Sequence, residues 1–369
     1  MNKRTEVIVV GGGPAGIVAA IAAQSRGRQV TVLDARKPPI DKPCGEGILP
    51  QGIAALKQLG ISLPAEDAFP FRGIRFADEK YSVRADFAHE CGLSVRRVRL
   101  HRMLADYAVE AGVEFRWGSR VTQIDDHKVV TPLETFSYDW LIGADGQNSQ
   151  VRKWAGLEPP AARRKRFGFC SHFDLEPWSD VAEVHWTSGC QIFITPMRRN
   201  EVGVAVISRD PQLRFDRAID KFPFLAEKLR GAMQTTRELG DTTGLRILPA
   251  VTKGRIALIG DASGTVDAVT GHGLSLSFQQ AISLAESMEQ RDLEHYAVSH
   301  KKIASLGITM TRLMTLMSES DWIRQRTLRL FEITPSLFNR MLAIHTGTVP
   351  LSSVGVAEIA DFSWRFLRA

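Results

Sequence analysis

The chain has few cysteines and no long apolar run. Its four cysteines, Cys44, Cys91, Cys170 and Cys190, form no CxxC pair and have no histidine-rich companion motif. A structural zinc site or a disulfide framework is therefore not expected, and we predict no bound metal and a reducing, cytoplasmic compartment. No stretch approaches the ~20 apolar residues that span a bilayer. The first strand is expected from residue 6, so no signal peptide is expected before it.

The basic residues form no pattern typical of nucleic-acid binding. The formal net charge is +6, and the densest cluster, Arg163-Arg164-Lys165-Arg166, has no aromatic residues interleaved with it. Because stacking on bases needs aromatic side chains, this cluster is predicted to be a solvated loop, and no nucleic-acid partner is expected. A second interpretation is that the positive charge attracts an anionic cofactor such as NADPH, or an acidic substrate.

The chain is too long for one ordinary hydrophobic core. It has 369 residues, of which 44% are hydrophobic. One large domain and a smaller one are therefore expected. The sequence shows no internal repeat and no low-complexity tract.

The first thirty-four residues predict a β-α-β unit. Residues 6–10 read EVIVV, residues 11–16 read GGGPAG, and an alanine-rich helical stretch covers 17–24. A second apolar strand at 29–33 ends on Asp34. This order of strand, glycine-rich turn, helix, strand and acid is typical of a dinucleotide-binding fold.

Each glycine of this turn has a physical reason. Gly11 permits the tight turn out of the strand, Gly13 lets a pyrophosphate approach the backbone, and Gly16 lets the helix pack closely on the sheet. The pyrophosphate is then expected at the free N–H groups and the positive end of the helix. Asp34 lies where a carboxylate accepts hydrogen bonds from an adenosine ribose.

The rest of the chain is assigned from periodicity and turn residues. The expected strands are 71–78 paired with 81–87, then 113–117, 120–124, 135–138, 140–146 and 255–259. The expected helices are 51–59, 97–111, 149–154, 213–234, 273–289 and a Leu-, Met- and Arg-rich region from about 295 to the end.

A change of pattern in the middle of the chain predicts a second domain. Short strands are expected at 167–173, 181–186, 191–195 and 202–207, the last two joined as a hairpin through 197–201. This is typical of an antiparallel sheet inserted into the first domain. We assign 1–70, 96–160 and 246–295 to the nucleotide-binding domain. Residues 71–95 and 161–245 are assigned to a substrate-binding sheet, and 296–369 to a C-terminal helical region.

Three further stretches accompany the glycine-rich turn. They are IGADGQNSQVR at 142–152, ALIGDASG at 257–264 and VTGHGLSLSF at 269–278, with Arg97 near the start of a helix. Together these motifs resemble the FAD-dependent aromatic hydroxylases (class A flavoprotein monooxygenases) and the geranylgeranyl reductases. The resemblance covers roughly residues 1–60, 96–155 and 250–290, and it implies non-covalently bound FAD and a Rossmann-like α/β fold with an inserted antiparallel sheet.

The resemblance implies roles for particular residues. Asp261 would accept hydrogen bonds from a ribityl chain, and the helix opened by Gly271-His272-Gly273 would face flavin N1 and O2 and stabilise the anionic reduced flavin. Arg97 would neutralise pyrophosphate or ribityl oxygens, and the Asp145-Gly146 turn would serve both FAD and nicotinamide. The alternatives are helix N-caps for Asp261 and Asp145 and a surface ion pair for Arg97. The full predicted cofactor-binding set is Gly11, Gly13, Pro14, Ala15, Gly16, Asp34, Ala35, Arg36, Cys44, Gly45, Arg97, Val121, Ala144, Asp145, Gly146, Gly260, Asp261, Gly271, His272, Gly273 and Leu274.

The segment PCGEGI at 43–48 resembles a loop of the geranylgeranyl reductases. Ala268 stands where both groups usually have proline, and His272 where the reductases usually have glutamate. Cys44 and Glu46 are expected near the flavin or the substrate mouth, with a buried thiol and a loop-capping acid as the alternative. A halogenase-type GWxWxIP stretch, a second GxGxxG and a CxxxxC redox pair are absent from the sequence.

The inserted sheet supplies candidates for a substrate pocket. They are His172, His185, Trp186, Gln191 and Phe193, although strand alternation turns about half of such residues away from any one face. A buried histidine with satisfied hydrogen bonds is the simpler interpretation of each histidine. The catalytic candidates are Cys44, Glu46, His185 and His272.

The function expected from the resemblance is an NAD(P)H-dependent monooxygenase. It would use O2 and a flavin C4a-hydroperoxide to hydroxylate an apolar, aromatic or polyketide-like small molecule, and NAD(P)H would dock transiently. One alternative is a reductase of isoprenoid or other C=C bonds, in which Cys44 or water supplies a proton. Another is a non-catalytic flavin-binding or membrane-surface protein, since a basic amphipathic C-terminal segment suits peripheral membrane contact.

Overall fold

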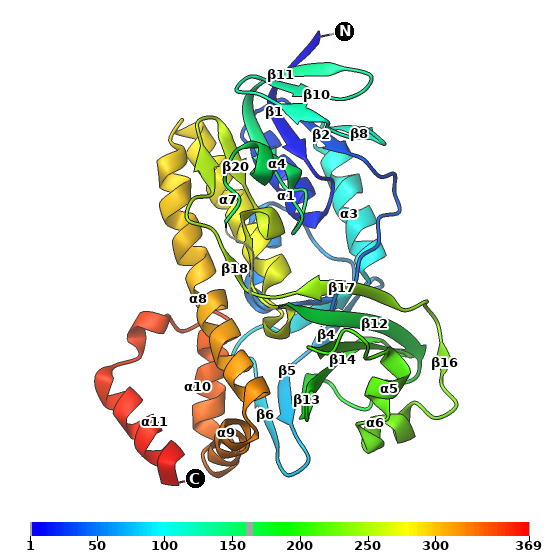
Figure 1. Cartoon of the computed structure of the whole chain (residues 1–369), viewed down its shortest axis with the longest axis vertical. Coiled ribbons are helices and arrows are strands. Elements are labelled where there is room, and N and C mark those ends of the chain that lie inside the picture. Colours follow the sequence, from blue (N-terminus) through cyan, green and yellow to red (C-terminus); the bar gives the residue numbers. More distant parts are fainter. Residues whose placement is uncertain (1, 160–164, 369) are drawn as a thin grey trace.

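The computed structural model describes residues 2–159 and 165–368, and it contains two large sheets with a long helix extending from the level of one to that of the other (Figure 1). The upper sheet in this view contains the N-terminal strand, and the lower sheet comes from the middle of the chain. The long helix is α8 (Leu293–Glu319). The predicted fold class, α/β with an inserted antiparallel sheet and a helical C-terminal region, is confirmed.

The upper sheet carries the predicted β-α-β unit. Its strand order is β19-β20-β11-β1-β2-β8. The parallel strands are β1 (Asn2–Val10), β2 (Val30–Asp34), β8 (Glu114–Trp117), β11 (Thr135–Gly143) and β20 (Ile256–Leu258). The antiparallel additions are β9 (Gln123–Ile124), β10 (Lys128–Val130) and β19 (Thr252–Lys253). Because parallel strands end at the same edge, the loops that follow β1, β2, β11 and β20 meet there.

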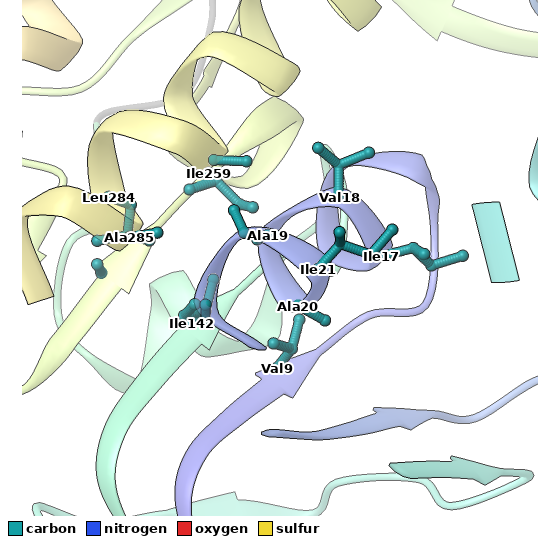
Figure 2. Close-up of a cluster of buried hydrophobic side chains, with 14 of the residues drawn as sticks. Val9, Ile17, Val18, Ala19, Ala20, Ile21, Ile142, Ile259, Leu284 and Ala285 are labelled. Carbon is teal, nitrogen blue, oxygen red and sulfur yellow. The ribbon is translucent and has the colours of Figure 1, made fainter. Parts of the chain in front are cut away.

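The core of this domain forms where alanine-rich α1 (Pro14–Gln24) packs on the sheet. Figure 2 shows Ala19 and Ala20 of α1 among larger side chains of β1, β11 and α7 (Gly273–Glu289). Small side chains let the helix approach the strands closely, and α3 (Arg97–Glu110) packs on α1 as well. The edge of the sheet at which the parallel strands end is therefore supported by closely packed helices.

The lower sheet is the predicted inserted sheet, with the order β16-β12-β15-β14-β13-β5-β6 and β17 beside β12. Its strands are β5 (Gly73–Ala77), β6 (Ser82–Asp86), β12 (Arg166–Asp174), β13 (Ala182–Thr187), β14 (Cys190–Arg198), β15 (Glu201–Ser208), β16 (Met233–Gln234) and β17 (Leu239–Thr243). The predicted β5–β6 pair and β14–β15 hairpin are confirmed, and only the β13–β5 pairing is parallel among these strands.

Small elements connect the two sheets. They are β3 (Gly47–Ile48), α2 (Pro50–Gln58), β4 (Ala68–Phe71), β7 (Gly92–Val95), α4 (Gln150–Trp154), β18 (Arg246–Ile247), β21 (Gly264–Thr265) and the short 3₁₀ turns η1 (Gly260–Ser263) and η2 (Ala268–Thr270). The division of the chain into three regions with the boundaries given above stays a prediction. Its boundary at 160/161 lies outside the described residues.

After α8 the chain continues as α9 (Asp321–Ile333), α10 (Pro335–His345), η3 (Leu351–Ser353) and α11 (Val356–Arg368). The aromatic side chains of α9 and α10 close one face of the inserted sheet, where Phe338 lies 5.0 Å from the ring of Phe76. Trp364 and Leu367 of α11 are exposed. Within the described parts of the chain, no helix has the length and apolar character needed to cross a membrane.

Two predictions about local structure were wrong. The expected helix 213–234 is two short helices, α5 (Phe215–Ile219) and α6 (Pro223–Lys228), followed by the edge strand β16. Pro223 starts a new helix because its ring fits the first helical position but not a helix interior. The expected solvated basic loop fails at Arg166, which is buried and bonds Asp267 through two nitrogens at 2.8 and 2.5 Å. Arg163 and Arg164 lie outside the described residues.

Candidate functional site

A cavity of about 670 Å³ lies between the two sheets. We call one part of its lining the strand-end half and the other the inserted-sheet half. The strand-end half is formed by Gly11, Gly13, Asp34, Arg97, Ala144, Asp145, Gly260, Asp261, Gly271 and Gly273. The inserted-sheet half is formed by Ile74, Gly168, Cys170, Val184, Phe193, Ala205 and Ile207. The loop 43–48 contributes to the lining between them.

Of the three motif glycines in the glycine-rich turn, two have no room for a side chain and one does. Gly11 has φ +111, and a Cβ there would lie 2.3 Å from the Ala144 carbonyl oxygen. A Cβ on Gly16 would lie 1.9 Å from the carbonyl oxygen of Gly11. At Gly13 a Cβ would meet only Nη2 of Arg97, at 3.9 Å. Gly11 and Gly16 are thus required by packing, whereas Gly13 borders open space at the start of α1.

The start of α1 is suited to an anion. Gly13 is the N-cap and provides no side-chain hydrogen bond, so the first backbone N–H groups of the helix have no side-chain cap. Arg97, the first residue of α3, points its guanidinium toward the same place, and its buried Nε has no hydrogen-bond partner. A buried, unpaired guanidinium nitrogen is costly. A phosphate oxygen would satisfy both groups.

The carboxylate of Asp34 is fixed at the end of β2. Its Oδ2 accepts a 2.7 Å hydrogen bond from the Gly12 N–H, and its Oδ1 accepts one of 2.7 Å from the Arg36 N–H. Since an ionised carboxylate has about four acceptor sites, these two hydrogen bonds leave further acceptor capacity on a residue that lines the cavity. This geometry fits a carboxylate that accepts ribose hydroxyls.

Asp261 and Asp145 differ in what their carboxylates do. Asp145 accepts hydrogen bonds from Ser149 Oγ at 2.5 Å and from the Gln150 N–H at 2.7 Å, so its carboxylate is engaged at the start of α4, although the N-cap residue of that helix is Ser149 and not Asp145. The Asp261 side chain lines the cavity, where it is open to solvent inside the protein. The protein that surrounds it raises its pKa by desolvation, and nearby Lys42 lowers it. Asp261 is therefore the freer acceptor in the strand-end half.

The turn before α7 presents backbone rather than side chains to the cavity. Gly271 has φ +66, and Gly271, Gly273 and Leu274 line the cavity, whereas His272 does not. Nε2 of the buried His272 ring lies within hydrogen-bond distance of the His345 carbonyl oxygen. Because a carbonyl oxygen only accepts, Nε2 carries the proton and donates it. Burial lowers the pKa of His272 to about 4, so the ring is neutral near pH 7.

Most of the predicted cofactor-binding set lies on this one cavity. Gly16 and His272 are the members that do not line it. The lining members are Gly11, Gly13, Pro14, Ala15, Asp34, Ala35, Arg36, Cys44, Gly45, Arg97, Val121, Ala144, Asp145, Gly146, Gly260, Asp261, Gly271, Gly273 and Leu274. These residues fit FAD, because they combine an uncapped helix start, an orphaned guanidinium nitrogen and carboxylate acceptors after β2 and β20.

The loop 43–48 holds both of its predicted candidates at the cavity. Glu46 is buried, has φ +58, and contacts His172 of β12 with 2.5 Å between Oε2 and Nε2. Burial raises the pKa of the Cys44 thiol, and burial raises that of Cys170 to about 12. Both thiols are therefore protonated near neutral pH and are weak nucleophiles.

Of the five pocket candidates from the inserted sheet, Phe193 lines the cavity. His172 is bonded to Glu46, and His185 to Glu183 at 2.8 Å while stacking on Phe224. Trp186 packs edge-on against Phe76, with ring centres 5.0 Å apart, and Gln191 bonds Arg166. The simpler interpretation, a histidine with satisfied hydrogen bonds, describes both histidines.

Several lining residues were not predicted. The cavity also contacts Lys42, Ser119, Arg120, Gln147, Asn148, Trp154, Asp241, Thr243 and Val269. Lys42 was recognisable, because it precedes the irregular segment 43–48. The small residues Gly168 and Ala205 gave no signal, since their role is to leave space in the inserted-sheet half. Within the described residues, no group of three or more His, Cys, Asp or Glu side chains is arranged to hold a metal ion.

Comparison with known proteins agrees with this geometry. The family model described as an FAD binding domain matches residues 4–290. The menaquinone reductase of Mycobacterium tuberculosis (strain ATCC 25618 / H37Rv) is 27% identical over 325 residues, which cover 79% of this chain and 78% of that protein. The para-nitrophenol 4-monooxygenase of Pseudomonas sp. (strain WBC-3) is 26% identical over 364 residues, covering 87% and 89%.

Solved structures share the fold at low sequence identity. A flavoprotein/dehydrogenase from Cytophaga hutchinsonii superposes with a TM-score of 0.81 at 18% identity, covering 93% of each chain. A geranylgeranyl bacteriochlorophyll reductase-like protein from Thermoplasma acidophilum superposes with a TM-score of 0.74 at 19% identity, covering 98% of this chain and 96% of that one. The similarity therefore extends through the inserted sheet as well as the nucleotide-binding domain.

Proposed function

The chain belongs to the FAD binding domain family, in the superfamily of class A flavoprotein monooxygenases and geranylgeranyl reductases, and is an FAD-dependent oxidoreductase; we propose that it is an NAD(P)H-dependent monooxygenase of an apolar small molecule. The observation that carries the proposal is the single cavity shared by the strand ends and the inserted sheet. Bound FAD would take a hydride from NAD(P)H and activate O2 for transfer to an aromatic or polyketide-like substrate.

The strand-end half would hold the cofactor. Gly13 and the start of α1 would receive the pyrophosphate together with Arg97, and Asp34 would receive the ribose. Asp261 would bind ribityl hydroxyls. The start of α7 at Gly271 and Gly273 would stabilise negative charge on the isoalloxazine ring.

The inserted-sheet half would hold the substrate. Its side chains are mainly apolar, namely Phe193, Val184, Ile207 and Ile74, and Glu183 and Thr195 are its polar members. Such a surface excludes water and favours an uncharged aromatic or aliphatic group. The described residues hold one glycine-rich nucleotide turn of the GxGxxG type, at 11–16. NAD(P)H would therefore dock transiently at the cavity mouth.

A C=C reductase is the second candidate, and two observations favour it. The menaquinone reductase is a relative over most of both chains, and the thiol of Cys44 lines the cavity as a protonated group. In that reaction the cavity would accept a long apolar substrate, and the chain would supply one proton to the carbon that does not receive hydride.

Product analysis separates the two functions. FAD-loaded protein would be incubated with NADPH or NADH and panels of phenols, polyketides and prenylated quinones, with isotopically labelled O2. A product that gains one labelled oxygen atom supports the monooxygenase. A product that gains two hydrogen atoms and forms without O2 supports the reductase and contradicts the monooxygenase. Protein that cannot be loaded with FAD would overturn both proposals.

A further inference from the structure

Glu46 is held in an unusual backbone conformation at the cavity wall. It is one of two described non-glycine residues with positive φ, the other being Arg291. The left-handed conformation is unfavourable for a residue with a side chain, so surrounding contacts must enforce it. Its Oε1 accepts a 2.7 Å hydrogen bond from the Arg97 N–H, its carbonyl accepts one of 3.0 Å from the Val95 N–H, and Oε2 lies 2.5 Å from His172 Nε2.

His172 is fixed on its other side by Thr236. The Thr236 hydroxyl oxygen lies 2.9 Å from His172 Nδ1 and accepts a 3.0 Å hydrogen bond from the His172 backbone N–H. A hydroxyl oxygen has two acceptor sites, and donation from the backbone N–H and from Nδ1–H fills both. The same 2.9 Å contact also fits donation from the Thr236 hydroxyl to Nδ1, and we assign the proton to Nδ1. The exchangeable position is then Nε2, which faces Glu46.

We propose that Glu46 and His172 form an acid–base pair that holds one exchangeable proton and exchanges it with the cavity. In the loaded state the proton lies between His172 Nε2 and Glu46 Oε2. On release, the Nε2–H bond breaks with its electron pair left on the ring, and Glu46 passes the proton to a basic atom in the cavity. A neutral imidazole and a carboxylate remain. Water entering the cavity reloads the pair by the reverse transfer.

The reaction chemistry requires such a proton, and here the inference rests on the proposed function. Hydroxylation with NAD(P)H and O2 consumes one proton for each NAD(P)H oxidised, because one oxygen atom leaves as water. Reduction of a C=C bond also consumes one proton, because NAD(P)H supplies only a hydride. Glu46 lines the cavity and is therefore placed to deliver it.

The charged and titratable groups named here, which lie beside Glu46 and His172, do not compete with this pair for the proton. Arg96 lies 3.7 Å from Glu46 Oε1 and is bonded to Glu201 at 2.5 Å, while Arg97 faces Glu46 through its backbone N–H. One guanidinium group, that of Arg96, thus lies between the carboxylates of Glu46 and Glu201. Cys44 and Cys170 are the neighbouring thiols, and burial keeps both protonated, so neither competes as a base.

A second Glu–His pair on the same sheet provides a control. His185 bonds Glu183 at 2.8 Å, is half-buried and stacks on Phe224 of α6, and it is Glu183 rather than His185 that lines the cavity. The two pairs have similar chemistry, but His172 contacts a carboxylate on the loop 43–48 and His185 one on its own strand. His185→Gln therefore tests whether proton delivery is specific to the pair at the loop 43–48, because equal slowing in His185→Gln and His172→Gln would contradict that assignment.

The first test detects the proton on the His172 ring by NMR and requires no catalytic turnover. Histidine labelled with ¹⁵N would be incorporated into the FAD-loaded protein, and the His172 signals among the nine histidines assigned with His172→Gln. We expect a shared proton at His172 Nε2 that Glu46→Gln removes, while Nδ1 keeps its proton in both proteins. A His172 ring protonated only at Nε2, in both proteins and at every pH, would overturn the proposal. Thr236→Val keeps both partners and should remove the preference for Nδ1.

The second test measures delivery and needs no substrate. Re-oxidation of the photoreduced holoprotein by O2 to hydrogen peroxide takes up one proton, which an indicator dye can follow by stopped flow. Glu46→Gln and His172→Gln should slow this reaction at least about tenfold and flatten its pH profile, and added acetate should restore part of the rate in Glu46→Gln. His185→Gln should match the parent protein. Unchanged rates and pH profiles in both pair variants would overturn the proposal, whether the natural reaction is oxygenation or reduction.

Discussion

The two halves of the cavity are built from different parts of the chain. In the strand-end half, backbone groups face the cavity at Gly13, Gly271 and Gly273, and side chains enter at fixed strand ends, as Asp34 does. In the inserted-sheet half, side chains such as Phe193 and gaps left by Ala205 shape the space. A surface made of backbone depends on glycine spacing and tolerates little change. A surface made of side chains can be altered one residue at a time, which suits a fold that serves many substrates.

Substitutions of the turn glycines should change stability more than any other variant discussed here, and they test whether backbone forms the strand-end half. Gly11→Ala places a Cβ 2.3 Å from the Ala144 oxygen in a left-handed conformation, and we expect a loss of at least about 4 kcal/mol in the free energy of unfolding. Gly13→Ala meets only Arg97 Nη2, at 3.9 Å. It should cost the apoprotein about 1 kcal/mol or less but weaken FAD binding about ten- to a hundredfold. Urea unfolding of apoprotein and FAD titration measure the two effects.

The contrast between the two glycine variants is the informative result. If Gly13→Ala destabilises the apoprotein as much as Gly11→Ala, this turn is required for packing throughout and is no specific pyrophosphate site. If Gly13→Ala keeps normal FAD affinity, the pyrophosphate lies elsewhere in the cavity.

Acid is expected to weaken the strand-end half first. His272 and His300 are buried behind it, bonded to the His345 carbonyl at 2.8 Å and to Ser263 Oγ at 2.9 Å, and burial lowers the pKa of each to about 4. Unfolding returns each pKa to about 6.5, so the unfolded chain binds more protons between these values. Stability is then complete above pH 6.5 and falls as pH drops toward 4, by up to about 3 kcal/mol for each ring.

Urea unfolding between pH 4 and 7.5 checks this expectation, with FAD fluorescence reporting cofactor release. His300→Gln should reduce the slope of stability against pH by about a third or less, because burial also lowers the pKa values of His345 and His101. His295→Gln, at an exposed position on the same helix, should leave it unchanged. A stability that does not vary with pH in this window would show that these rings are solvated, and would remove the difference between the two halves.

Arg97 tests whether charge as well as backbone defines the strand-end half. Its Nε is buried without a partner, so a bound phosphate should gain a charge-assisted hydrogen bond. Arg97→Ala is expected to weaken FAD binding by about 1.5–3 kcal/mol, and Arg97→Lys to recover part of this because lysine keeps the charge but not the planar donors. The neighbouring Arg99, paired with Asp67 at 3.2 Å, is the control, and Arg99→Ala should bind FAD normally. Equal affinity in all three variants would place the phosphates away from α3.

These contrasts also explain what the sequence was able to predict. The β-α-β unit and the strand-end loops were predictable because GGGPAG, Asp34 and the later glycine-flanked acids are local patterns with fixed spacing. The contact between Glu46 and His172 joins residues 126 positions apart, and no local pattern encodes it. The direction of His272 was equally hidden, because a histidine at a helix start can turn toward the cavity or toward α10. Arg166 appeared as one of four cationic residues, although Asp267 makes it a buried ion pair.

The smallest expected effects lie in the inserted-sheet half. Phe193→Ala enlarges it and Ala205→Val reduces it, and neither residue contacts the proposed pyrophosphate or ribose sites. We expect FAD affinity to stay within about 0.5 kcal/mol of the parent, while affinities for apolar aromatic probes shift by about 1–3 kcal/mol in directions that depend on probe size. Larger probes should gain from Phe193→Ala and lose from Ala205→Val. Perturbation of the flavin absorbance on probe titration measures this. If both variants instead lose FAD and leave probe binding unchanged, the cofactor's ring system occupies the inserted sheet, and the two halves exchange the roles assigned to them.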